Sequence, residues 1–200
     1  MDLGSDLILV TGASGWLGRA VLNALVNGLP DSPQLGLPVS GLRIRALVLP
    51  GEELSLTDIS RDIDVVAGDL RNPLDGIRLC SGARGATLLH LAGIIHPRRV
   101  RDFRDVNVRG TVNALSAAAE CGVRRAVVMS SNSPCGCNPH PDHVFDEDSP
   151  YHPYMGYGRS KMEMEQRGAE FQAGGRTETV VNRAPWFYGP FQPPRQTLFF

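Results

Sequence analysis

The stretch Leu7-Ile-Leu-Val-Thr-Gly-Ala-Ser-Gly-Trp-Leu-Gly18 decides the fold of this chain of 200 residues. Residues 7–11 form a nearly continuous apolar run, which is typical of a strand buried on both faces. Three glycines follow at equal spacing, and residues 15–27 then carry apolar side chains at helical spacing. A buried strand, a glycine-rich turn and a helix in this order indicate a turn that holds phosphate groups.

Each glycine of this turn meets a different steric need. Gly12 permits a tight turn, Gly15 lets the backbone approach a pyrophosphate, and Gly18 allows the helix to pack closely on the strand. The first N–H groups of a helix have no partner within it, and its dipole is positive at that end, so both attract phosphate. The residues predicted to bind phosphate here are Gly12, Ser14, Gly15, Trp16, Leu17 and Gly18.

Strand and helix patterns alternate along the rest of the chain. Further strands are predicted at 42–49, 64–67, 86–91, 126–130 and 178–183, and further helices at 103–121 and 154–173. This alternation indicates βαβ units with right-handed crossovers and a parallel sheet. The predicted fold class is therefore α/β, with a doubly wound parallel sheet of the Rossmann type.

Composition and charge narrow the choice of partners. A net charge of −1 gives no general attraction to nucleic acid or anionic lipid, and no apolar run is long enough to span a membrane. No signal-peptide pattern precedes the first strand, and four scattered cysteines do not form a disulfide framework. We therefore expect a cytoplasmic protein with reduced thiols that acts on a small molecule, without nucleic-acid or membrane partners.

Lysine occurs once, at Lys161, whereas the other 19 of the 20 basic residues are arginine. Lysine is a compact charge with a tunable pKa, so a single lysine in this background indicates a role that arginine cannot fill. It ends the motif Tyr157-Gly-Arg-Ser-Lys161, whose i, i+4 spacing puts the phenol and the ammonium on one face of a helix. An ammonium near a phenol stabilises the phenolate, which suits proton exchange with a hydroxyl or carbonyl group.

A serine cluster, Ser130-Ser-Asn-Ser133, follows the predicted strand at 126–130. Active sites of open α/β sheets lie beyond the carboxyl ends of the strands. The cluster is therefore expected at the same edge of the sheet as the glycine-rich turn.

These motifs together resemble the extended branch of the short-chain dehydrogenase/reductase superfamily, whose turn reads Thr-Gly-x-x-Gly-x-x-Gly. Further marks of that family are Gly68-Asp-Leu70, His90-Leu-Ala-Gly93, Asn107-Val-Arg-Gly-Thr111 and Arg183-Ala-Pro-Trp-Phe-Tyr-Gly-Pro190. The resemblance implies an NAD(P)-binding Rossmann domain over residues 1–190. It also implies that residues 191–200 begin a substrate-binding region that is missing or truncated.

The resemblance also implies roles for single residues, in a hydride transfer between a nicotinamide and a secondary alcohol or ketone. Tyr157 would exchange the proton, and Lys161 would tune Tyr157 and bind the cofactor ribose. Ser131 would orient the substrate oxygen, with Ser133 as the alternative. The further cofactor-binding residues that the family motifs imply are Asp69, Leu70, Leu91, Ala92, Gly93, Asn107 and Pro185.

The sequence leaves the choice between NAD and NADP open. The usual signal is an acidic or basic residue at the end of the second strand, and this place is taken by Leu49-Pro50. Glu52 or Glu53 could reach a ribose hydroxyl, and Arg45 could reach a 2′-phosphate.

Two departures from family patterns bear on the substrate. Asn132-Ser133 stands where nucleotide-sugar 4,6-dehydratases carry an Asp-Glu pair, and Trp186-Phe-Tyr188 lacks the Asn of galactose-type 4-epimerases. The chain looks closer to the 3β-hydroxysteroid dehydrogenase-like branch, with nucleotide-sugar epimerase or dehydratase chemistry as the alternative. The expected substrate is a nucleotide sugar or a hydroxy or keto compound. The sequence leaves open whether the chain forms a homodimer. A non-catalytic NAD(P)-binding regulator or an inactive fragment is the alternative from another class.

The segment Cys135-Gly-Cys-Asn-Pro-His-Pro-Asp-His143 contains four cysteine and histidine residues, which supply the nitrogen and sulfur ligands that suit zinc. Its prolines and tight spacing make a tetrahedral cage awkward, and it falls where the family has a variable active-site loop. We expect a loop that faces substrate or solvent and no metal site.

Overall fold

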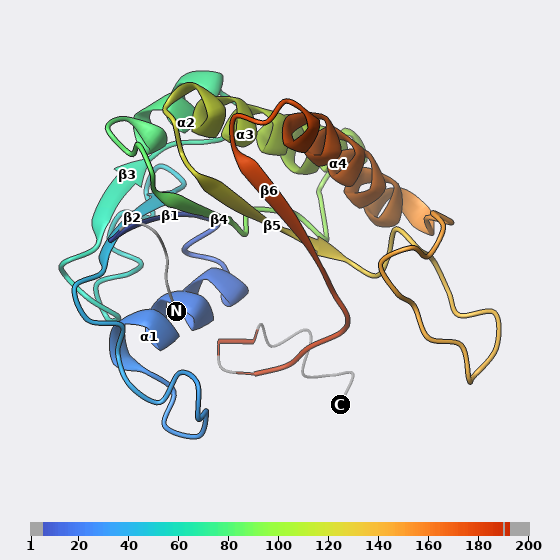
Figure 1. Ribbon diagram of the computed structural model, residues 1–200, viewed down its shortest axis with the longest axis horizontal. Coiled ribbons are helices and arrows are strands. Elements are labelled where there is room, and N and C mark those ends of the chain that lie inside the picture. Colours follow the sequence, from blue (N-terminus) through green and yellow to red (C-terminus); the bar gives the residue numbers. More distant parts are fainter. Residues whose placement is uncertain (1–5, 190, 193–200) are drawn as a thin grey trace.

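A parallel sheet of six strands, in the order β3-β2-β1-β4-β5-β6, forms the centre of the computed structural model, which describes residues 6–189 and 191–192 (Figure 1). The strands are β1 (Leu7–Thr11), β2 (Arg43–Val48), β3 (Asp64–Ala67), β4 (Thr87–His90), β5 (Arg125–Ser131) and β6 (Glu178–Ala184). The helices are α1 (Trp16–Asn27), α2 (Pro73–Cys80), η1 (Phe103–Arg109), α3 (Gly110–Glu120) and α4 (Met155–Ala173). The predicted doubly wound α/β fold is confirmed.

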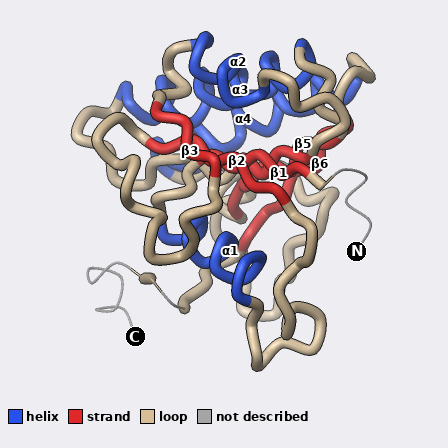
Figure 2. Tube along the Cα trace, turned by 90° about the vertical axis from the view of Figure 1, so that its left-hand side faces the viewer, coloured by secondary structure: helices blue, strands red, loops and turns tan. Residues whose placement is uncertain are grey.

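Helices cover both faces of the sheet. Helix α1 lies on one face, and α2, α3 and α4 lie on the other (Figures 1 and 2). Strand β1 contributes to both cores, because Leu7 and Leu9 pack under α2, α3 and α4 whereas Ile8 and Val10 pack under α1. All five residues of β1 are buried, which explains why the strand is apolar without alternation.

The winding direction reverses between β1 and β4. The chain leaves β1 toward β2 and β3, and it leaves β4 toward β5 and β6 on the other side. Thr11, the last residue of β1, is in register with Leu47 of β2 and His90 of β4. Open α/β sheets bind ligands at such a reversal, beyond the carboxyl ends of the strands. The glycine-rich turn that follows Thr11 lies at this place.

The helix predicted at 103–121 is present, but it begins as the π-helix η1 over residues 103–109 and only then continues as the α-helix α3. The Asn107 side chain is fully buried here and forms hydrogen bonds with both the N–H and the carbonyl oxygen of Ile94. The hydroxyl of Thr111 donates to the carbonyl oxygen of Asn107 at 2.6 Å. These contacts accompany the wider turn, and such π-turns are frequent at functional sites.

Helix α2 was not predicted. Its signals are short but clear, because Asn72 caps the backbone N–H of Leu74 at 3.3 Å and Pro73 takes the first helical position. Asp75 adds a carboxylate in the first turn, where the helix dipole favours it. An eight-residue helix offers too few periods for its apolar spacing to stand out.

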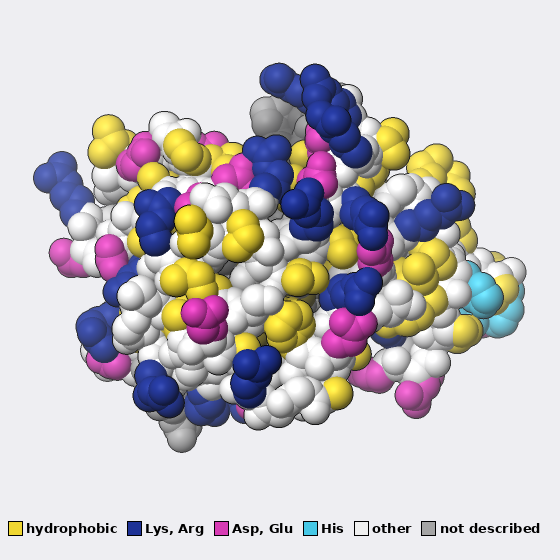
Figure 3. Space-filling model, turned by 90° about the horizontal axis from the view of Figure 1, so that it is seen from above, with side chains coloured by type: hydrophobic (Ala, Val, Ile, Leu, Met, Phe, Trp, Pro, Cys, Tyr) yellow, Lys and Arg dark blue, Asp and Glu magenta, His cyan; other side chains and the backbone are white. Residues whose placement is uncertain are grey.

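Acidic and basic side chains are intermixed over the face made by α2, α3 and α4 (Figure 3). Several of them pair, as Arg104 does with Glu163 at 3.3 Å and Arg167 with Glu170 at 2.9 Å. Within the described residues, no helix combines the length and the apolar character needed to cross a membrane.

Candidate active site

The glycine-rich turn is shaped by backbone crowding. Gly12 has φ +68°, and a Cβ there would lie 2.6 Å from the backbone nitrogen of Ala92. A Cβ on Gly18 would overlap the carbonyl oxygen of Gly12. Gly15 is the N-cap of α1 and provides no side-chain cap. Both steric predictions for the turn, at Gly12 and Gly18, agree with this geometry.

Glu52 reaches the same turn from the segment after β2. The hydroxyl of Ser14 donates to its carboxylate at 2.6 Å. Arg45, the other residue considered for cofactor choice, is held elsewhere: it pairs with Asp64 at 2.6 Å and donates to the carbonyl oxygens of Leu79 and Ser81. The structure therefore places the Glu52 carboxylate, and not the Arg45 guanidinium, beside the glycine-rich turn.

A buried chain of hydrogen bonds runs from β1 to α3 through His90. Thr11 Oγ1 and Thr111 Oγ1 each lie 2.8 Å from one ring nitrogen of His90. Since the Thr111 hydroxyl donates to Asn107, it accepts from His90 Nε2, and Nδ1 accepts from Thr11. Burial, aided by the charge of Lys161, lowers the pKa of His90 to about 3, so the ring is neutral.

Asn107 joins the helix η1 to the segment after β4 and to α4. It accepts from the N–H of Ile94 at 2.8 Å and donates to the Ile94 carbonyl and to Ser160 Oγ. A Cβ on Gly93 would lie 3.4 Å from Asn107 Oδ1 and 3.3 Å from Lys161 Nζ. The structure thus brings together three of the predicted site residues, Gly93, Asn107 and Lys161.

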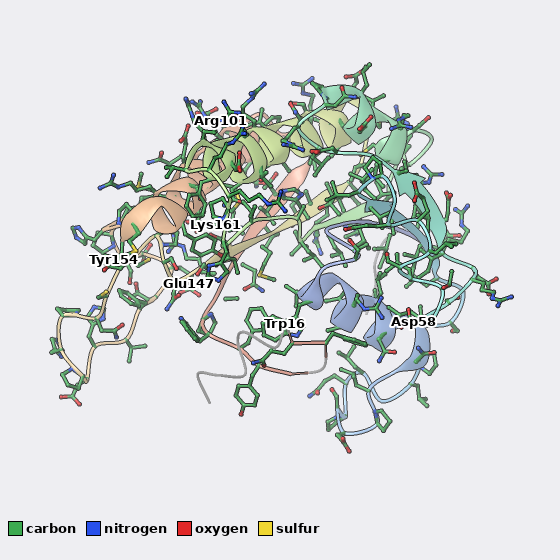
Figure 4. The ribbon with its side chains drawn as sticks, turned by 180° about the vertical axis from the view of Figure 1, so that it is seen from behind. Trp16, Asp58, Arg101, Glu147, Tyr154 and Lys161 are labelled. Atoms are coloured by element: carbon green, nitrogen blue, oxygen red, sulfur yellow. The ribbon has the colours of Figure 1, made fainter. Side chains whose placement is uncertain are left out.

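Lys161 projects from α4 toward the sheet, while Trp16 lies at the start of α1 (Figure 4). The Lys161 side chain is buried, and its ammonium donates to the carbonyl oxygen of Met129 at 2.8 Å. Burial lowers the pKa of Lys161 to about 8, against the opposing effect of Glu165. The role of Lys161 as a tunable charge stays a prediction, and its burial is the feature of the structure that bears on it.

Tyr157 lies near Lys161, whose Nζ is 6.0 Å from the centre of the phenol ring. Burial raises the pKa of Tyr157, and a hydrogen bond with Ser131 opposes this effect. The two candidate serines are close, with 3.0 Å between Ser131 Oγ and Ser133 Oγ. Gly158 lets α4 approach them, because a Cβ there would lie 2.7 Å from the Ser133 carbonyl oxygen. Ser131 is thus the serine that contacts Tyr157.

The remaining predicted residues line the carboxyl edge of the sheet. The carboxylate of Asp69 pairs with Arg71, and this hydrogen bond holds the pKa of Asp69 below its usual range. Leu70 is buried, and Leu91 and Ala92 are half-buried. Their contact with a cofactor stays a prediction, as does that of the exposed Pro185. Residues 193–200 of the predicted substrate-binding region lie outside the described residues.

Two features of the site were not found from the sequence. The ring of Phe187 packs against Trp16, with 4.9 Å between ring centres. Neither residue type nor spacing signals a contact between residues so far apart in the chain. Glu165, a buried carboxylate on α4, has a sequence signal, because it continues the spacing of four from Tyr157 and Lys161.

The Cys135–His143 loop brings two histidines near each other, with 5.7 Å between the ring centres of His140 and His143. Cys135 is buried and Cys137 is exposed. In the part of the chain that the structure describes, no three residues of the ligating types gather as a metal site would require.

Residues 8–199 match the NAD dependent epimerase/dehydratase family. Among curated proteins, the uncharacterized protein y4nL of Sinorhizobium fredii is 54% identical over 202 residues, which covers 100% of this chain and 56% of that protein. The chain therefore spans about half the length of the curated relatives it matches.

Solved structures also resemble this chain, among them two that contain NAD. A short-chain dehydrogenase/reductase superfamily protein from Agrobacterium tumefaciens with bound NAD is 30% identical, with a TM-score of 0.66 over 88% of this chain and 48% of that one. MoeE5 in complex with UDP-glucose and NAD is 28% identical, with a TM-score of 0.70 over 94% of this chain and 57% of that one. The chain belongs to the NAD dependent epimerase/dehydratase family, within the short-chain dehydrogenase/reductase superfamily that its turn motif resembles.

Proposed function

We propose that this chain binds NAD and supplies the proton-transfer residues of an oxidoreductase or epimerase that acts on a secondary alcohol or ketone. The observation that carries the proposal is the meeting of Gly93, Asn107 and Lys161 next to Tyr157 and its partner Ser131. A buried cation, a phenol and a hydroxyl at the carboxyl edge of a doubly wound sheet are what such a proton transfer needs.

The glycine-rich turn fits a dinucleotide. The backbone at Gly12 and Gly18 is too close to its neighbours for any side chain, so the turn presents backbone groups to a ligand. The N-terminus of α1 adds N–H donors and a positive dipole end, which favour a pyrophosphate. The short-chain dehydrogenase/reductase protein from Agrobacterium tumefaciens and MoeE5, which this structure resembles, were both solved with NAD bound.

Glu52 supports NAD as the cofactor. Its carboxylate, fixed by Ser14 at 2.6 Å, is an acceptor for a ribose hydroxyl beside the turn. The same negative charge would repel a 2′-phosphate. Arg45, which could have attracted that phosphate, is held by Asp64.

The chain's own residues divide the proton chemistry. Tyr157 exchanges the proton at its phenolic oxygen, and Ser131 orients the substrate oxygen beside it. The Lys161 ammonium favours the phenolate form and binds the ribose, while Asn107 fixes the backbone next to it. NAD, when bound, supplies the hydride acceptor or donor.

A nucleotide sugar is the second candidate substrate. MoeE5, at 28% identity, was solved with UDP-glucose as well as NAD. Against it stands Asn132-Ser133, which departs from the acidic pair of the dehydratases. We further propose residues 1–190 as the dinucleotide-binding domain, with the substrate-binding region beginning at 191.

The test has two parts, which separate an enzyme from a binding protein. NADH and NADPH titrations, followed by quenching of the tryptophan fluorescence of Trp16 and Trp186, measure cofactor binding. Turnover is then compared for the wild type and Tyr157→Phe with nucleotide sugars and with hydroxysteroid-type alcohols. We expect NADH binding in both proteins and a loss of turnover by about 10²–10⁴-fold in the variant. Binding without turnover that depends on Tyr157 would identify a regulator or an inactive fragment and overturn the enzymatic part of the proposal.

A further inference from the structure

Glu165 is a buried carboxylate on α4, with 4% of its surface exposed. It follows Lys161 by four residues, so the two side chains lie on the same face of the helix. A buried charge is costly unless it is paired and hydrogen-bonded. Its surroundings therefore decide whether Glu165 is only packed into the fold or acts on the site.

Three side chains donate to this carboxylate. The Ser130 hydroxyl donates to Oε1, while Tyr151 donates to Oε2 at 2.9 Å and Arg183 Nε donates to Oε2 at 3.0 Å. Ser130 and Arg183 are register partners on β5 and β6. Arg183 also donates to the carbonyl oxygen of Glu147, which lies in the loop before α4. Glu165 thus links α4 to both strands and to that loop.

Lys161 and Glu165 contact adjacent residues of β5, since Lys161 donates to the Met129 carbonyl oxygen and Glu165 accepts from Ser130. Arg183 is the cation that pairs directly with this carboxylate, at 2.9 Å. Burial acts to neutralise Lys161, and among the described residues Glu165 is the carboxylate that opposes this. The other titratable groups near Lys161 are Tyr157 on α4 and the neutral His90 on β4. Neither supplies a negative charge.

We propose that Glu165 is a positioning residue of this site, whose carboxylate keeps the Lys161 side chain cationic and ties the strand end at Ser130 to α4. The proposal rests on the proposed function, in which the Lys161 ammonium binds the cofactor ribose. Glu165 then acts on the cofactor through Lys161 and not by contact.

Because Lys161 is the chain's single lysine, its titration can be followed alone. Protein labelled with ¹³C at lysine Cε gives one side-chain resonance, without any cofactor. We expect a midpoint near pH 8 in the wild type and about one pH unit lower in Glu165→Gln. Glu163→Gln, on the same helix but paired with Arg104 at the surface, is the matched control and should leave the midpoint unchanged.

A second variant separates charge from damage to the fold. Arg183→Met removes the cation that pairs with this carboxylate, so the midpoint of Lys161 should rise, whereas it falls in Glu165→Gln. Disruption of packing has no reason to move the midpoint in opposite directions in the two variants. If Glu165→Gln does not fold, the rise of the Lys161 midpoint in Arg183→Met still tests the proposal. An unchanged midpoint in either folded variant, or a fall in both, overturns the proposal.

NADH affinity connects the titration to function. With a midpoint lowered by one unit, charged Lys161 falls from about one half to about one tenth at pH 8, but only slightly at pH 6.5. Glu165→Gln should therefore weaken NADH binding about fivefold at pH 8 and less than twofold at pH 6.5. Equal weakening at both pH values overturns the positioning role. A wild type that binds no NADH overturns the proposed function instead, and the lysine titration distinguishes the two failures.

Discussion

The neutral state of the buried His90 should make the stability of this protein depend on pH in a defined window. In the folded protein its pKa is lowered to about 3 by burial and by the charge of Lys161. In the unfolded chain the pKa of histidine returns to about 6.5. Below pH 6.5 the unfolded state therefore binds a proton that the folded state does not, so the free energy of unfolding falls as the pH falls.

The size of this effect follows from the two pKa values. Each pH unit between 6.5 and 3 costs about 1.4 kcal/mol, so His90 removes about 2 kcal/mol of stability between pH 7.5 and pH 5.0. The variant His90→Gln cannot titrate, and its amide can still donate to Thr111. It should be less stable than the wild type at pH 7.5, because the Thr11 hydroxyl loses its acceptor.

Urea denaturation of both proteins at pH 7.5 and pH 5.0 measures the difference. Carboxylates and the other histidines contribute equally to both proteins, so only the difference between their pH dependences is assigned to His90. The wild type should lose about 2 kcal/mol more than His90→Gln. ¹⁵N spectra of the imidazole at pH 5.0 should show a neutral ring protonated at Nε2. Equal losses in the two proteins, or a charged ring at pH 5.0, would refute the reasoning.

Two further predictions concern the phosphate turn. Gly12→Ala combines a φ of +68° with a contact of 2.6 Å to Ala92, so it should cost about 2 kcal/mol or more in urea denaturation and abolish NADH binding. Gly41→Ala, with φ +71° and no neighbour within 4 Å, is the control, because it carries the cost of the backbone conformation without a steric clash. Equal losses of stability at both sites would show that the contact with Ala92 adds nothing. Glu52→Gln should raise the affinity for NADPH relative to NADH by about tenfold, because the charge facing a 2′-phosphate is removed. The exposed neighbour variant Glu53→Gln should not change this ratio in titrations with the two cofactors, and an unchanged ratio in Glu52→Gln would exclude Glu52 from cofactor choice.

The sequence predicted the sheet well, because each strand is marked by local features. The run at 7–11 is apolar since β1 is buried on both faces, and 64–67 was placed at the bounds of β3. The wide turn of η1 could not be predicted in this way. It accompanies contacts of Asn107 with residues 13 and 53 positions away, and no periodicity of residues 103–121 reports such contacts.

The candidate site shows the same difference between local features, which a sequence reveals, and contacts between distant residues, which it does not. Tyr157 and Lys161 lie on one helix, so their spacing alone puts them on one face. The partners that set their protonation come from elsewhere: Ser131 from β5, and the Arg183 that shares Glu165 from β6. Proton affinity depends on burial and on charges brought together by folding, and the sequence does not show these. It could therefore indicate which residues carry the chemistry but not how they are tuned.

The surroundings of Lys161 give a physical reason why the chain has lysine, and not arginine, at this position. Its ammonium has the Met129 carbonyl oxygen at 2.8 Å and a thioether at 3.8 Å, and Gly93 packs so closely that a Cβ there would lie 3.3 Å from it. A guanidinium is larger and has five donors to satisfy, so it would be both crowded and unpaired here. It would also stay charged at every relevant pH, whereas burial at this place lowers the pKa of lysine to about 8. In a chain that otherwise uses arginine for every positive charge, this one position requires a small cation whose charge the surrounding fold can adjust.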